Sequence, residues 1–278
     1  MKNVIALLHV FKNGTTSIVD RYSHNKRFVY VRSKNEAILN HNSATIPSKS
    51  IPLKLIKNYD PGIILGHGVT FNNLDLPNHN VKYVTVLRNP IERIISAYNY
   101  YLLELYTLWG RKASNIDFYT WFINKNRILP TPCNYQYEHF ITPRLDLLKT
   151  MYSGAVETSP IITNYKTELN KKEQGWIEEQ QHEDVHKAVE LVKENCSHVL
   201  FMDDDYIHKF DRLVTTYDIK CEPKEDIKHT HNTKKDLDWI GKKYVSYKRL
   251  DNDSKDLLAK HMKPEIIFYN KCKEIFYE

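Results

Sequence analysis

A lysine, a glycine and three consecutive hydroxyl side chains stand together in the segment HVFKNGTTS, residues 9–17. The apolar run before this segment predicts a buried strand, and residues 16–22 predict the start of a helix. A helix N-terminus presents backbone N–H groups and the positive end of its dipole, which together bind phosphate or sulfate. Gly14 permits close backbone approach, and Lys12 supplies a mobile cation. The segment therefore predicts an anion site, with an ordinary turn whose hydroxyls only cap the helix as the alternative.

A second group of anion-binding residue types lies in VTVLRNPIERIIS, residues 84–96. Tyr83–Leu87 is an apolar run of strand length, and Pro90 is typical of the first turn of a helix. Arg88 is therefore expected at the carboxyl end of a strand, where open α/β sheets bind ligands. Ser96 lies about two helical turns further on. A guanidinium and a hydroxyl suit a second phosphate group, unless Arg88 simply pairs with a surface carboxylate.

Pattern and composition disfavour several classes of function. The Walker A pattern GxxxxGK[ST] is absent, and here the lysine precedes the glycine, so a kinase or NTPase is disfavoured. The net charge of +6 favours anionic partners but is too small to indicate a nucleic-acid-binding protein. The four cysteines are widely separated and form no CxxC pair, so we expect reduced, mostly buried thiols: Cys133, Cys196, Cys221 and Cys272.

Together the two segments resemble the PAPS-dependent sulfotransferases, most closely the heparan sulfate and uronyl 2-O-sulfotransferase branch. The likeness covers roughly residues 3–102 and includes an Arg-x-Pro-Ile/Val-x-Arg pattern followed by a serine and a tyrosine-rich helix, here RNPIER and SAYNYY. It implies 3′-phosphoadenosine 5′-phosphosulfate (PAPS) as cofactor, adenosine 3′,5′-bisphosphate (PAP) as product, and no required metal. It also implies that Arg88 and Ser96 hold the 3′-phosphate. Lys12 would contact the phosphosulfate and stabilise charge on the leaving phosphate, and the 5′ end would be held by Asn13, Gly14, Thr15, Thr16 and Ser17.

His67 is the candidate catalytic base among 13 histidines. It ends the apolar run Ile64-Leu65 between two glycines, which places it at the same sheet edge as Lys12 and Arg88. Histidine can remove a hydroxyl proton at neutral pH. The 2-O-sulfotransferase branch has a Gly-His element ahead of its Arg-x-Pro motif, at nearly the separation that His67 has from Arg88 here. That branch has a further histidine where this chain has Leu65. A plain turn residue is the alternative for His67, and His9 is expected to pack structurally beneath the first segment.

A late basic segment and several aromatic residues complete the candidate site. The resemblance suggests a loop closing over the nucleotide, with Lys228, Thr230 and Lys234 as loose counterparts, although a solvated charged loop fits equally well. The histidines of that loop lack the carboxylate or cysteine pattern of a metal site. The expected acceptor is a saccharide hydroxyl, with a small polar metabolite sulfated on oxygen or nitrogen, or a non-catalytic nucleotide-binding or polyanion-binding module, as alternatives. Guesses for the acceptor pocket are Tyr100, Tyr101, Tyr135, Gln136 and His139.

Strands alternating with helices predict an α/β, P-loop-like, three-layer fold with a central parallel sheet of about four to five strands flanked by helices. We expect one sulfotransferase domain over residues 1–278, with residues 33–60 as loop and short helix, residues 166–190 as exposed helix, and residues 254–276 as one bent helix or two. No stretch approaches the ~20 apolar residues of a membrane helix, and the run Val4–Leu8 is too short for a signal peptide. A cytoplasmic enzyme is therefore expected, with its oligomeric state left open.

Overall fold

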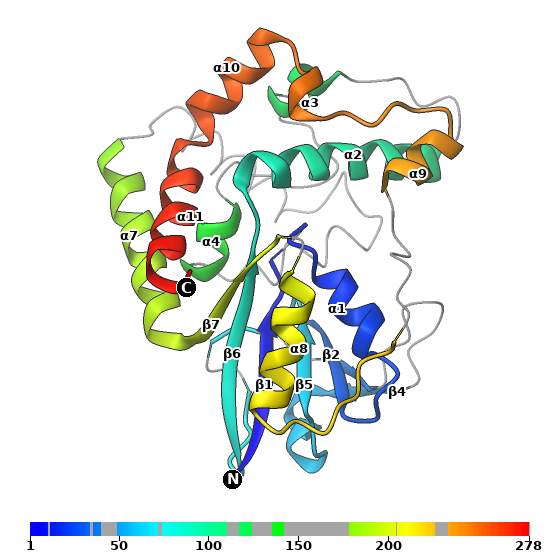
Figure 1. Ribbon diagram of the computed structural model, residues 1–278, viewed down its shortest axis with the longest axis vertical. Coiled ribbons are helices and arrows are strands. Elements are labelled where there is room, and N and C mark those ends of the chain that lie inside the picture. Colours follow the sequence, from blue (N-terminus) through cyan, green and yellow to red (C-terminus); the bar gives the residue numbers. More distant parts are fainter. Residues whose placement is uncertain are drawn as a thin grey trace.

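The computed structural model describes residues 1–10, 12–33, 36–39, 49–71, 74–109, 117–123, 135–141, 178–203, 205–225 and 233–277. Its centre is a seven-stranded sheet in the order β4-β3-β2-β5-β1-β6-β7 (Figure 1). Five neighbouring strands run parallel, which confirms the predicted α/β class and parallel sheet: β2 (Phe28–Ser33), β5 (Ile63–Gly66), β1 (Lys2–Leu8), β6 (His79–Leu87) and β7 (Cys196–Phe201).

Two antiparallel strands extend the sheet beyond β2. They are β3 (Glu36–Leu39) and β4 (Lys49–Pro52), and a 3-10 helix, Leu53–Asn58, follows them. The prediction of loop and short helix for residues 33–60 was therefore wrong about the strands. Each strand is only four residues long, too short to show alternation of apolar and polar side chains. Pro52 ends the edge strand β4, a place where its missing N–H group removes no ladder hydrogen bond.

Helices cover both faces of the sheet because alternate strand residues point to opposite sides. In β1, Ile5 and Leu7 pack with α1 (Thr15–Tyr22) and α8 (Tyr206–Thr216). Val4 and Leu8 belong to the core on the other face. The sheet is thus the middle of three layers, as predicted.

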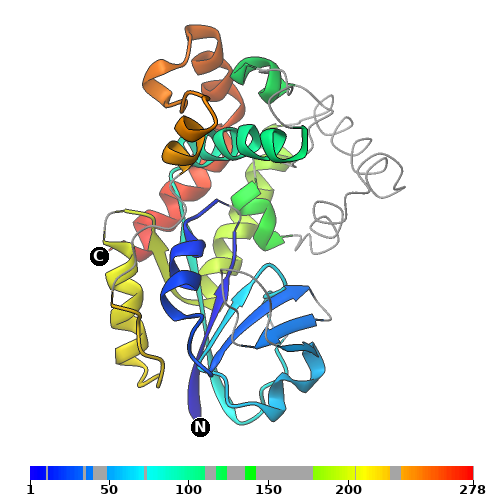
Figure 2. The same cartoon turned by 90° about the vertical axis from the view of Figure 1, so that its right-hand side faces the viewer.

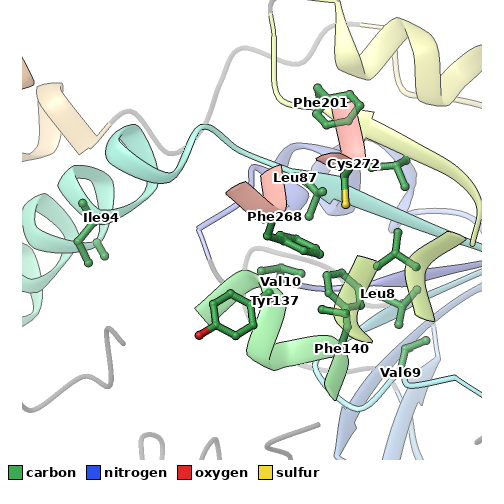
Figure 3. Close-up of a cluster of buried hydrophobic side chains, with 14 of the residues drawn as sticks. Leu8, Val10, Val69, Leu87, Ile94, Tyr137, Phe140, Phe201, Phe268 and Cys272 are labelled. Carbon is green, nitrogen blue, oxygen red and sulfur yellow. The ribbon is translucent and has the colours of Figure 1, made fainter. Parts of the chain in front are cut away.

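The second face is covered by α4 (Tyr135–Ile141), α7 (Glu178–Asn195) and α11 (Lys263–Phe276). Helix α7 packs against both α4 and α11. Figure 3 shows Leu8 of β1 and Val10 of the loop that follows it beside Phe140 of α4 and Phe268 of α11. Helix α11 begins at Lys263 with Pro264 in its first turn, so the C-terminal segment forms two helices rather than one.

Helix α2 (Pro90–Trp109) crosses above the carboxyl ends of β1 and β6 (Figure 1). Three further helices gather with it at this end of the molecule, as Figure 2 shows: α3 (Phe118–Ile123), α9 (Thr233–Trp239) and α10 (Asn252–His261). Helix α9 packs on α2, and α10 packs on α3. Among the described helices, none is both long and apolar enough to cross a bilayer.

Candidate functional site

The first loop, residues 9–14, joins β1 to α1 through two residues with left-handed backbone. Lys12 has φ 65° and Gly14 has φ 78°. Gly14 is the N-cap of α1, no side chain caps the helix there, and its first turn holds no acidic residue. The Ser17 N–H group donates to the Gly14 carbonyl at 3.1 Å, whereas the N–H groups of Thr15 and Thr16 precede the first hydrogen bond of the helix. The helix end is therefore suited to an external anion.

Tyr206, the first residue of α8, fixes this loop. Its hydroxyl donates a hydrogen bond of 2.9 Å to the Gly14 carbonyl and accepts one from the Ser17 hydroxyl. A Cβ atom on residue 14 would lie 2.8 Å from the Tyr206 Oη and 3.0 Å from the Met202 Sδ. Sequence reasoning missed Tyr206 because one tyrosine among 19 carries no distinguishing pattern.

The second loop, residues 88–89 between β6 and α2, meets the first loop directly. Arg88 Nη1 donates to the Lys12 carbonyl at 3.4 Å. The Lys12 ammonium lies 4.1 Å from the centroid of the Tyr100 ring. Ser96 precedes Tyr100 by one turn of α2, and residues at this spacing share a helix face. The two predicted anion-binding segments therefore come together at one edge of the sheet.

Arg88 is a poorly paired cation in a mostly buried setting. Its side chain is 17% exposed, and its Nε has no hydrogen-bond acceptor among the described residues. Glu92 Oε2 lies 3.8 Å from this Nε, beyond hydrogen-bond reach, and the Glu92 side chain is 63% exposed. Burial lowers the pKa of Arg88, with Glu92 acting in the opposite direction. An ion pair with Glu92 therefore does little to offset the burial of the Arg88 guanidinium, because exposed pairs contribute only about 0–1 kcal/mol.

His67 follows β5 at the same edge and lies against His9. Its side chain is 5% exposed, and the two imidazole rings stack with centroids 3.9 Å apart and planes at 19°. Gly66 has φ 147°, and a Cβ there would lie 2.2 Å from the Val31 carbonyl oxygen, so only glycine allows this turn. His9, expected to pack beneath the first loop, is thus in direct contact with His67.

The environment of His67 favours its neutral form. Burial lowers the pKa of His67 to about 4, and a hydrogen bond to the backbone of His9 acts in the opposite direction. A bond that raises the pKa is one in which the ring donates, so the acceptor is the His9 carbonyl. Nδ1 of His67 has no hydrogen-bond partner within the described ranges. Burial also lowers the pKa of His9, followed by the influence of His67, His139 and Lys12.

The other predicted nucleotide-binding residues differ in their surroundings. Asn13 is fully buried, and its side chain faces the protein, where Nδ2 donates to Val86 O at 2.7 Å. The Thr15 hydroxyl is buried without a hydrogen-bond partner in the described part of the chain, whereas Thr16 is exposed. Lys234 is exposed on α9. Lys228 and Thr230 lie outside the described residues.

The guesses for the acceptor pocket need correction at two positions. Tyr101 is 4% exposed and packs against Trp121 in the core, since its helical spacing reflects an apolar face. Gln136 is fully buried, and its amide is hydrogen-bonded to the Arg88 backbone. His139 is also buried and influences His9. The side chain of Tyr135 lies outside the described residues.

The described residues include three cysteines and no candidate metal site. No group of three or more His, Cys, Asp or Glu side chains in the described chain could hold a metal ion. Three cysteines are buried free thiols: Cys196, Cys221 and Cys272. Burial raises the pKa of Cys272 to about 12, which makes it unreactive at neutral pH. Cys133 lies outside the described residues.

No protein-family model and no curated protein matches the chain. Among solved structures, a sulfotransferase from Alicyclobacillus acidocaldarius is similar, with a TM-score of 0.37 and 10% sequence identity. The alignment covers 100% of this chain and 97% of that chain. A structural similarity this weak carries no argument about activity. The functional inference therefore rests on the geometry of the site.

Proposed function

We propose that this chain is a sulfotransferase that moves a sulfuryl group from PAPS to a hydroxyl of a carbohydrate-like acceptor by in-line displacement. The observation that carries the proposal is the contact between Arg88 and the Lys12 carbonyl. It brings the N-terminus of α1 and a poorly paired guanidinium to one sheet edge. Two anion sites on adjacent loops suit one nucleotide that carries a phosphate-type group at each end.

The residues at this edge fit such a nucleotide. The buried Thr15 hydroxyl and the buried Arg88 Nε each lack a hydrogen-bond partner among the described residues, and phosphate oxygens would satisfy both. Gly14 allows the left-handed turn that starts α1, and Tyr206 packs where a Cβ atom would otherwise stand. In this proposal the α1 N-terminus, Thr15 and Ser17 hold the 5′ end, and Arg88 with Ser96 holds the 3′-phosphate.

When bound, PAPS supplies an activated sulfuryl group. In this proposal Lys12, whose ammonium lies over the Tyr100 ring, neutralises charge on the phosphate. The cation–π contact with Tyr100 contributes about 0.5–2 kcal/mol. A charge-assisted hydrogen bond to phosphate contributes about 1.5–3 kcal/mol and is directed at charge that grows as the bond breaks.

His67 accepts the proton of the acceptor hydroxyl. Its Nδ1 lone pair has no competing donor within the described residues, and its pKa of about 4 keeps the ring neutral at physiological pH. A base with so low a pKa is weak, but a bound anion at the same edge stabilises the imidazolium and raises its pKa. Nucleotide binding would thus bring His67 closer to the pKa that suits proton transfer.

The test combines binding with turnover. We expect PAP to raise the melting temperature of the protein more than ATP does at equal concentration. Incubation with labelled PAPS and a panel of glycans, small alcohols and amines, read by mass shift, then identifies the acceptor. Transfer to an amine or a small metabolite would replace the carbohydrate part of the proposal.

A His67→Gln variant separates catalysis from binding. We expect loss of turnover with unchanged PAP affinity, because His67 acts on the acceptor. Unchanged turnover would remove His67 from the mechanism. PAP binding without transfer to any acceptor of the panel would favour a non-catalytic nucleotide-binding module.

A further inference from the structure

Gln136 of α4 lies between the two anion-binding loops and is fully buried. Its Oε1 accepts hydrogen bonds from the Arg88 backbone N–H at 3.0 Å and from the Asn13 Nδ2 at 2.8 Å. Its Nε2 donates to the Arg88 carbonyl at 2.9 Å. The side-chain amide therefore pairs with the Arg88 backbone in both directions, as a neighbouring strand would, while also holding the first loop.

Asn13 completes this connection. Its Nδ2 donates both to Gln136 and to Val86 O, the latter at 2.7 Å. Asn13 is the residue between Lys12 and Gly14, and Val86 is two residues before Arg88. The position of the first loop relative to the second is thus fixed by two buried amides, both with zero exposed surface.

Gln136 is itself held by a buried ion pair. Both carboxylate oxygens of Glu265 accept from the Gln136 backbone N–H, at 3.0 and 3.2 Å. Glu265 Oε1 also lies 3.2 Å from Arg93 Nη2, and both side chains have zero exposure. Glu265 belongs to α11 and Arg93 to α2, and Figure 1 shows α4 beside α11 and below α2. Three helices therefore fix one glutamine.

We infer that Gln136 is a positioning residue that sets the separation of the two loops, so that they bind the two phosphate-bearing ends of one nucleotide together. The inference rests on the proposed function, since it takes that nucleotide as the ligand. Two linked sites bind a two-ended ligand more tightly than either end alone, provided that the spacing of the sites matches the ligand. Each loop on its own can still bind one phosphate when the spacing changes.

The test compares three ligands: PAP, adenosine 5′-monophosphate and adenosine 3′-monophosphate. For the wild-type protein we expect calorimetry to give at least about tenfold tighter binding of PAP than of either monophosphate. In Gln136→Met, which removes all three side-chain hydrogen bonds, PAP affinity should fall at least about tenfold. The two monophosphate affinities should stay within about twofold of wild type.

A second variant covers the case in which Gln136→Met does not fold. Gln136→Glu keeps the shape and the acceptor for Arg88 N–H and Asn13 Nδ2, but places an oxygen against the Arg88 carbonyl. We expect it to show a smaller loss of PAP affinity of the same kind. The matched control is Asn25→Leu, because the Asn25 amide also pairs with a backbone in both directions, that of Glu222, at 3.0 and 2.9 Å. Asn25 lies in the turn after α1, away from both loops, and its loss should leave all three affinities unchanged.

The outcomes separate the two proposals. Failure of wild-type protein to bind PAP would overturn both. PAP binding that falls in parallel with monophosphate binding in the Gln136 variants would overturn the inference alone, because Gln136 would then support one loop or the fold. Unchanged PAP affinity in both variants would also overturn it and leave the proposed function intact.

Discussion

Replacing Arg88 with methionine should separate stability from ligand binding. Methionine keeps most of the length of the side chain and removes the guanidinium. In the unliganded protein that guanidinium makes one long hydrogen bond, 3.4 Å to the Lys12 carbonyl, and its buried Nε makes none to the described residues. The backbone bonds of Arg88 to Gln136 do not depend on the side chain. Replacing Arg88 with methionine should therefore cost the protein little stability in the absence of nucleotide.

The expected magnitudes follow from these contacts. Removing a poorly paired buried cation should leave the free energy of unfolding unchanged or raise it by about 0–2 kcal/mol. A guanidinium that binds phosphate through two charge-assisted hydrogen bonds contributes about 1.5–3 kcal/mol for each. Since about 1.4 kcal/mol corresponds to a tenfold change, PAP affinity should fall at least about 100-fold.

The assay pairs urea unfolding without ligand with calorimetric titration of PAP. Arg93→Met is the matched control, because Arg93 is fully buried and lies 3.2 Å from Glu265. Its removal takes the guanidinium of a fully buried ion pair away from the Glu265 carboxylate and should lower the free energy of unfolding by about 3–5 kcal/mol. If Arg88→Met instead behaved like Arg93→Met in urea and bound PAP normally, Arg88 would be a structural cation and the proposed site would be wrong.

Three further results are expected. Gly14→Ala should weaken PAP binding at least about tenfold, because φ is 78° and the new Cβ would lie 2.8 Å from the Tyr206 Oη. Wild-type affinity in this variant would contradict the close packing of the first loop against Tyr206. Tyr206→Phe should lower PAP affinity about fivefold through loss of the bond to the Gly14 carbonyl, and calorimetry with no change would contradict a role for Tyr206 in holding the loop. Lowering the pH from about 6.5 to about 4 should lower the free energy of unfolding by about 3 kcal/mol through His67 alone. In this range His67 is protonated in the unfolded chain, whereas burial lowers its pKa in the folded protein to about 4 and keeps the ring neutral. Urea unfolding across this range should show a smaller pH dependence for His67→Gln, and an equal dependence would contradict the buried neutral ring.

Much of the sheet could be predicted because its parallel strands are buried on both faces. Continuous apolar runs such as Val4–Leu8 are typical of such strands. The antiparallel strands β3 and β4 were missed because each is only four residues long and is defined by pairing, of β3 with β2 and of β4 with β3, rather than by a pattern of its own. The start of β6 at His79 was missed for the same reason, since its first residues are polar and pair along β1.

The sequence indicated those parts of the candidate site that lie in consecutive residues, but not those that depend on contacts between distant segments. Lys12 and Arg88 each follow a strand, and parallel strands end at a common edge. Gln136 was assigned to the acceptor pocket because a polar amide beside tyrosines is typical of a sugar-binding surface. Its side-chain hydrogen bonds are instead with Asn13 and Arg88. No spacing along the sequence indicates that these three residues come together. The stack of His9 on His67 is hidden in the same way.

Several features of the site each reduce the stability of the unliganded chain. Lys12 adopts a left-handed backbone that favours glycine. Among the described residues, neither the buried Arg88 Nε nor the buried Thr15 hydroxyl has a hydrogen-bond partner. Helix α1 begins with no side-chain cap and no acidic residue. If the first loop were only a turn between β1 and α1, each of these unfavourable features would need its own explanation. Two bound anionic groups would satisfy the helix end, the hydroxyl and the guanidinium together, and departures from local rules with a common remedy are typical of a functional site.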